Sequence, residues 1–174
     1  MPNMPADTRM FINFLPSTIY DPVYCLQSTA KAVADRGLDP QTVVFEIVES
    51  DKASDSEHIK NIVAYYQRHG YRVALDDFGT GHNNLNALLN FRPDYIKVDK
   101  AIIGRLARDP TSQDLVRDLV RQAHARGTAV IAEGIETQTD FAVCVGLGMD
   151  HFQGFYFAKP SPHFTGDADF AVER

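Results

Sequence analysis

The chain has 174 residues, of which 44% are hydrophobic and 23% are charged. These fractions are close to globular averages, and they exclude a disordered chain, a collagen and a coiled coil. With 17 basic and 23 acidic residues, the formal net charge is −6. This balance argues against a nucleic-acid groove and against anionic membranes. A small anionic ligand stays compatible with it, because bound divalent cations can invert the local sign of the charge.

The two cysteines, Cys25 and Cys144, lie far apart in the sequence, which is typical of a reduced protein without a disulfide framework. No apolar run approaches the roughly 18 residues that a membrane span needs. The first residues also lack the charged and apolar regions of a signal peptide. We therefore expect a cytoplasmic protein with no DNA or membrane partner.

Short apolar runs recur along the chain and predict β-strands. They are rich in β-branched and aromatic residues and nearly continuous in apolarity, as strands buried on both faces should be. The runs cover residues 10–12, 43–45, 72–75, 95–96, 129–132 and, more weakly, 151–152.

Helical periodicity fills the segments between these runs, most clearly at residues 55–69 and 112–125. Gly70 and Gly127 follow these two segments and are expected to end the helices. Such strand-helix alternation predicts an α/β fold with a parallel sheet of about six units. A closed eightfold barrel takes about 250 residues. The chain is thus an open sheet or a barrel lacking its first part, and the early strand at residues 10–12 favours the incomplete barrel.

Polar side chains follow nearly every predicted strand, and in a parallel barrel these strand ends share one rim. The alternative is that each acid caps the next helix, but acids at three strand ends, with an amide and a lysine, favour a common site. We predict one cluster at the carboxyl ends of the strands, formed by Asn13, Glu46, Asp76, Asp77, Lys97 and Glu133.

Several carboxylates at one rim of the barrel cannot all stay ionised without a compensating positive charge, and one lysine cannot compensate all of them. The candidate ligands are all oxygen donors, which favours Mg²⁺ or Mn²⁺, with Ca²⁺ able to compete. The adjacent pair Asp76 and Asp77 suits two metal ions about 3.5–4 Å apart, the arrangement that supports phosphodiester hydrolysis.

Four ordered motifs, DDFGTG at residues 76–81, IKVD at 96–99, AEGIET at 132–137 and QGFYF at 153–157, make the chain similar to the EAL domain family. The resemblance runs over about residues 11–162 and implies a single domain across residues 1–174, built as a TIM-like (β/α) barrel that is incomplete at its N-terminal end. Members of this family include cyclic di-GMP phosphodiesterases with two Mg²⁺ or Mn²⁺ ions per site.

The resemblance also implies roles for individual residues. Asn13, Glu46, Asp76, Asp77 and Glu133 resemble the family's metal ligands, and Glu133 also resembles the residue once assigned as general base. Lys97 resembles the residue that holds the attacking water, and Asp99 and Gln153 resemble residues near the metals. Glu49 resembles the glutamate that orders a loop over the active site.

The family's Glu-Ala-Leu motif, expected upstream of Asn13, does not occur in residues 1–12, and Val48 stands where the family has threonine. Residues 82–84 read HNN where the family has Tyr-Ser-Ser. Two functions stay open: a phosphodiesterase opening cyclic di-GMP to linear pGpG, or a non-catalytic EAL module that binds nucleotide or a protein partner. A barrel without its first strands exposes sheet edges, so we expect a homodimer or association with a preceding N-terminal segment or sensor domains.

Overall fold

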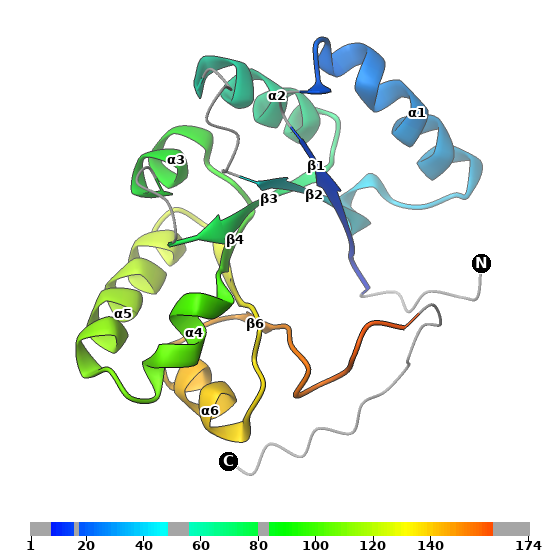
Figure 1. Cartoon of the computed structure of the whole chain (residues 1–174). Helices are drawn as coiled ribbons and strands as arrows, with labels where there is room; N and C mark the ends of the chain where they lie inside the picture. Colours follow the sequence, from blue (N-terminus) through cyan, green and yellow to red (C-terminus); the bar gives the residue numbers. More distant parts are fainter. Residues whose placement is uncertain (1–7, 16–17, 49–55, 80–83, 162–174) are drawn as a thin grey trace. The chain divides into compact units, whose positions relative to one another are not determined.

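The computed structural model describes residues 8–15, 18–48, 56–79 and 84–161. Strands and helices alternate along the chain (Figure 1), and the chain divides into two compact units, Met1–Ile96 and Lys97–Arg174. Within the described residues the sheet has six strands, which neighbour one another in chain order from β1 to β6. The predicted parallel α/β class with about six strand-helix units is confirmed.

The first unit consists of three complete strands, the beginning of a fourth, and the helices between them. Its elements are β1 (Met10–Phe14), α1 (Pro22–Asp35), a 3₁₀ turn (Pro40–Thr42), β2 (Val43–Val48), α2 (Ser56–Arg68), β3 (Arg72–Phe78), α3 (Asn84–Phe91) and the start of β4 (Tyr95–Val98). β1, β2 and β3 run parallel to one another. Each predicted strand core is present, and the strands extend further toward their carboxyl ends than the apolar runs alone indicated.

Aromatic side chains fix the face of β1 and β2 that is covered by α2. The ring of Tyr66 in α2 lies 4.6 Å from that of Phe45 in β2 and 5.6 Å from that of Phe14 in β1, measured between centroids. Because side chains alternate along a strand, Asn13 and Glu46 project from the opposite face. The helix-covered side is therefore the aromatic one, and the polar strand ends belong to the other.

The second unit contains the end of β4 and the elements α4 (Lys100–Leu106), α5 (Pro110–His124), β5 (Ala129–Ala132), α6 (Gln138–Gly146) and β6 (His151–Phe152). β5 and β6 are parallel, with Ile131 opposite His151. The backbone N–H of Glu133 donates to the carbonyl of Val98 at 3.1 Å, which joins the ends of β5 and β4.

The predicted helix at residues 55–69 is confirmed within one residue at each end, and Gly70 follows it with φ +86°. The helix predicted at 112–125 begins earlier, at Pro110. Asp109 is its N-cap, and the carboxylate accepts hydrogen bonds from the backbone N–H groups of Thr111 and Ser112. The Asp-Pro pair is a helix-start signal that apolar periodicity does not register.

Within the described residues, no helix combines the length and the apolar character that crossing a membrane requires.

The two thiols differ in accessibility, and this predicts a difference in reactivity. Burial, with a smaller contribution from the charge of Asp140, raises the pKa of Cys144 to about 12, whereas Cys25 is exposed. The thiolate is the reactive form, so at pH 8 the buried thiol is almost entirely unreactive. Iodoacetamide should label one thiol in native buffer and two in denaturing urea, and Cys25→Ser should abolish native labelling. Equal labelling of both thiols in native buffer would contradict the packing of α6.

Candidate functional site

In the first unit, three predicted ligand residues lie on one face of the β1–β3 sheet. Asn13 is opposite Glu46 in the register of β1 and β2, and Glu46 is opposite Ala74 of β3. Asp76 lies two residues beyond Ala74, so it projects from the same face one step nearer the carboxyl end. Glu46 is only 6% exposed, while Asp76 is half-buried and Asn13 exposed. The register thus brings an amide and two carboxylates to the same end of this sheet.

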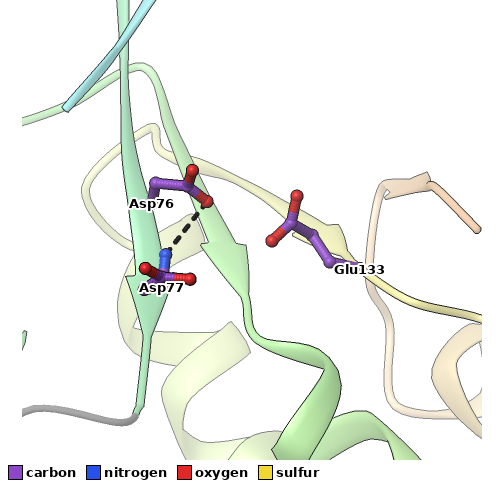
Figure 2. A group of neighbouring side chains, drawn as sticks. All are labelled: Asp76, Asp77 and Glu133. Atoms are coloured by element: carbon purple, nitrogen blue, oxygen red, sulfur yellow. Dashed lines mark hydrogen bonds between the residues drawn. The ribbon is translucent and has the colours of Figure 1, made fainter. Parts of the chain in front are cut away.

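Asp77 breaks the alternation of β3. Its φ is 54°, in the left-handed region, and its N–H donates to Oδ1 of Asp76 at 3.0 Å, the bond marked in Figure 2. A residue with a Cβ pays about 1–2 kcal/mol for this conformation, and aspartate adopts it more readily than most residues. Such local strain is concentrated at functional sites. At the end of β3, the backbone of Asp77 is therefore strained.

In the second unit, Lys97 and Glu133 form an ion pair. Nζ of Lys97 lies 2.6 Å from Oε1 of Glu133, and their side chains are 5% and 16% exposed. A lysine this deeply buried needs a partner for its charge. The hydrogen bond from the N–H of Glu133 to the carbonyl of Val98 fixes the backbone next to both residues. The two residues that the sequence places at the ends of β4 and β5 are thus in direct contact.

Two other predicted residues have local roles in the structure. Oδ1 of Asp99 accepts a hydrogen bond from the N–H of Ala101 at 2.7 Å, so Asp99 is the N-cap of α4. The contact observed for Asp99 is therefore the one expected if a strand-end acid caps the next helix. Gln153 exposes its side chain, and its backbone N–H donates to the carbonyl of Ala132 at 2.8 Å. The substrate-binding or loop-ordering roles of both residues remain predictions, and Glu49, for which the same role is predicted, lies outside the described residues.

The donor chemistry of these residues fits a hard divalent cation. Asn13, Glu46, Asp76 and Asp77 offer only amide and carboxylate oxygens, with Glu133 as the corresponding carboxylate of the second unit. Oxygen donors are the ligands that Mg²⁺, Mn²⁺ and Ca²⁺ prefer.

Two glycines that bear on the site, Gly134 and Gly154, were not predicted from the sequence. Each comes directly after a predicted site residue, Glu133 and Gln153 respectively. An isolated glycine at the end of a strand indicates a turn or a close backbone approach, and this signal could have identified them.

The ion pair predicts a measurable coupling. Lys97→Met should destabilise the protein by about 3 kcal/mol, because it leaves the carboxylate of Glu133 largely buried without its counter-charge. The double variant Lys97→Met with Glu133→Gln should lose less than the sum of the two single variants, by about 1–3 kcal/mol. Urea unfolding of the four proteins gives this coupling energy. Strictly additive losses would mean that the two side chains do not stabilise each other.

Known proteins are similar to this chain in sequence. The EAL domain family matches residues 1–160. The chain is 38% identical over 117 residues to the Escherichia coli protein named cyclic di-GMP phosphodiesterase PdeR, covering 67% of this chain and 18% of that protein. It is 34% identical over 125 residues to the Bacillus subtilis signaling protein YkoW, covering 72% of this chain and 16% of YkoW. The chain thus spans less than a fifth of the length of these two relatives.

Solved structures of EAL proteins are also similar to this chain. A standalone EAL protein from Vibrio cholerae in its c-di-GMP-bound form is 34% identical, with a TM-score of 0.83 over 90% of this chain and 66% of that one. Klebsiella pneumoniae BlrP1 in a manganese and c-di-GMP complex is 30% identical, with a TM-score of 0.81 over 87% of this chain and 39% of that one. The likeness confirms the TIM-like barrel class of the fold. The chain belongs to the EAL domain family.

Proposed function

We propose that this chain belongs to a cyclic di-GMP phosphodiesterase, which opens the cyclic dinucleotide to linear pGpG at a site with two divalent cations. The observation that carries the proposal is the all-oxygen donor set on one face of β1–β3, next to the strained Asp77. The names of the relatives support the substrate: PdeR is a cyclic di-GMP phosphodiesterase, and the Vibrio cholerae and BlrP1 structures contain c-di-GMP.

Oxygen donors at the strand ends would form the proposed metal site. Asn13, Glu46, Asp76 and Asp77 would bind the cations, Glu133 is a further candidate ligand, and the cations would supply charge neutralisation and an activated water. We propose Mg²⁺ or Mn²⁺ as the working ions. Among similar structures, BlrP1 is a manganese complex and Bacillus subtilis YkuI is a complex with c-di-GMP and calcium, which supports hard divalent ions as a class.

Lys97 and Glu133 have the chemistry for the reacting centre. The ammonium of Lys97 lies 2.6 Å from the carboxylate of Glu133, so it orients that carboxylate and places a positive charge beside it. In the proposed reaction Lys97 also donates a hydrogen bond to the attacking water, while Glu133 helps to hold a cation. A fixed ammonium in a partly buried site stabilises developing negative charge without reorganisation at the moment of reaction. This pair would therefore position the water relative to the phosphodiester.

Metal binding should be visible as stabilisation. A ligand that binds only the native state stabilises it by about 2.7 kcal/mol at 100 times its Kd, so millimolar Mn²⁺ or Mg²⁺ should raise the Tm by several degrees. Asp76→Asn should remove most of this rise. Asp114→Asn is the matched control, because Asp114 is a highly exposed residue of α5. A Tm unchanged by Mn²⁺ in the wild-type chain would contradict a formed metal site.

Product formation tests the reaction itself. With cyclic di-GMP and Mg²⁺ or Mn²⁺, chromatography should detect pGpG, and Glu133→Gln should lower the rate at least about 100-fold, the usual contribution of a positioned proton-transfer or ligand group. Glu57→Gln, a change at an exposed residue of α2, should leave the rate unchanged. We expect slow turnover by the chain of residues 1–174, because residues 1–12 contain no Glu-Ala-Leu ligand.

The same sequence feature favours a second function, that of a binding module without catalysis. Losing one metal ligand misplaces the nucleophilic water, and a displacement of about 1 Å can cost about a hundredfold in rate. Calorimetry separates the two functions, since binding of cyclic di-GMP without pGpG supports the module and Glu133-dependent pGpG supports the enzyme. Absence of both binding and turnover would contradict the two functions together.

We also propose that the chain associates through β1. Among the described residues β1 pairs only with β2, and its sequence MFINF has no charge and no proline to discourage a second partner. Phe11 at this edge is 37% exposed. A homodimer is the proposed assembly; association with sensor domains or a preceding segment and a cytoplasmic location stay predictions.

Light scattering at micromolar concentration tests this association. The wild-type chain should have at least twice the mass of one chain, and Phe11→Lys should reduce the mass to a monomer, because charged edge residues prevent strand pairing. Leu115→Lys is the control: Leu115 is also an exposed apolar residue, at 68%, but it lies in α5. A monomeric wild-type chain would contradict pairing through β1.

A further inference from the structure

Gly154, in the turn that follows β6, lies directly against the backbone of Ile135. A Cβ at position 154 would lie 2.7 Å from the carbonyl carbon of Ile135 and closer still to its nitrogen and oxygen. The φ of Gly154 is outside the left-handed region, so close approach rather than conformation requires glycine here. Because the opposing atoms belong to the backbone, no side-chain rotation could relieve the clash of a larger residue.

Hydrogen bonds fix both polar backbone groups of Ile135 to the same turn. The N–H of Ile135 donates to the carbonyl of Gln153 at 3.0 Å, and the N–H of Tyr156 donates to the carbonyl of Ile135 at 3.0 Å. The side chain of Ile135 is fully buried. The segment that leaves β5 is therefore attached to residues 153–156 through its main chain.

The preceding residue of this segment makes a second close contact. Gly134 has φ +68°, and a Cβ there would lie 3.3 Å from Cα of Lys100 and closer to Cβ of the same residue. Residues 133–135 thus lie against both the first residue of α4 and the turn at 153–156. The close approach at Gly134 limits movement of the segment toward Lys100.

The turn itself is anchored by an aromatic cluster. The ring of Phe141 in α6 lies 4.9 Å from that of Phe152, 6.0 Å from that of Tyr156 and 5.3 Å from that of Phe157, between centroids. These contacts hold both sides of Gly154 against α6. Because these ring contacts oppose movement of the turn, a side chain added at position 154 would press on the segment that carries Glu133.

We propose that Gly154 is a positioning residue, which holds the carboxylate of Glu133 against Lys97 by allowing the 153–156 turn to contact the backbone of Ile135. Nζ of Lys97 and Oε1 of Glu133 are 2.6 Å apart, so a small displacement of either side chain would lengthen the contact. Glu133 is only two residues from Ile135, so a shift of the Ile135 backbone would be transmitted to it. The consequence for metal binding rests on the proposed function, whereas the effect on the ion pair does not.

The test compares Gly154→Ala with Gly146→Ala, the same change at a position in α6 where an added Cβ meets nothing within 4 Å. Val116→Ala, at a buried residue of α5, serves as a control that lowers stability without touching the turn. The readouts are the ¹⁵N–¹H resonance of the Lys97 ammonium and the hydrogen-exchange protection of the Ile135 amide. A merely structural role would affect Gly154→Ala and Val116→Ala alike.

We expect Gly154→Ala to shift or broaden the Lys97 resonance, as Glu133→Gln does, and to lower Ile135 protection at least about 10-fold. The two control variants should keep both signals after correction for their stability. Affinity for Mn²⁺, measured by calorimetry, should fall at least about 10-fold in Gly154→Ala alone. An unchanged Lys97 resonance in a folded Gly154→Ala protein would overturn the proposal.

If Gly154→Ala does not fold, Phe141→Leu loosens the anchor of the same turn and should shift or broaden the Lys97 resonance; an unchanged resonance in that variant would also overturn the proposal. Absence of Mn²⁺ binding by the wild-type chain would contradict the proposed function instead, and the Lys97 and Ile135 signals would still decide whether Gly154 positions Glu133.

Discussion

Parallel strand register is the constraint on which the candidate site depends. Adjacent parallel strands place aligned residues on the same face, so the pairing of Asn13 with Glu46 and of Glu46 with Ala74 determines where the polar side chains of the first unit project. A slip of one residue would move them to the aromatic face that packs on Tyr66. The hydrophobic packing of Phe45 therefore also selects the position of Glu46.

In the second unit, the buried charge of Lys97 requires a partner of opposite charge. Lys97 is 4% exposed, and an ammonium in that environment is tolerated because the carboxylate of Glu133 lies beside it. The backbone around this pair is fixed from several directions, by Val98, by the start of α4 and by the turn that contains Gly154. This rigidity suits a site in which small displacements of a ligand are costly.

The parts of the fold that follow local rules could be read from the sequence. Apolar runs located the strands, and the polar residue after each run located Asn13, Glu46 and Glu133 at strand ends, because periodicity and strand direction are properties of neighbouring residues. The early start of α5 needed capping chemistry at Asp109 rather than periodicity. Asp99 shows the opposite difficulty, since a strand-end acid can equally be a helix cap and its sequence context is the same in both cases.

Contacts between segments that are distant in the sequence could not be predicted from local sequence patterns. Nothing near Gly154 in the sequence indicates that Ile135 lies against it, because that contact depends on the parallel pairing of β5 with β6. The 2.6 Å pairing of Lys97 with Glu133 is of the same kind, since it joins residues from two different strands. The left-handed φ of Asp77 also depends on how β3 ends.

The proposed function depends most directly on cation binding by the carboxylates at the end of β3. Paramagnetic line broadening by Mn²⁺ tests it most directly, because an Mn²⁺ ion broadens the amide resonances of every residue near it. In an NMR titration with substoichiometric Mn²⁺, the amides of Asp76 and Asp77 should broaden first, while the amide of the exposed control residue Asp114 stays sharp. Equal broadening of Asp77 and Asp114 at every Mn²⁺ concentration, or no broadening of Asp77, would contradict a metal site at the end of β3.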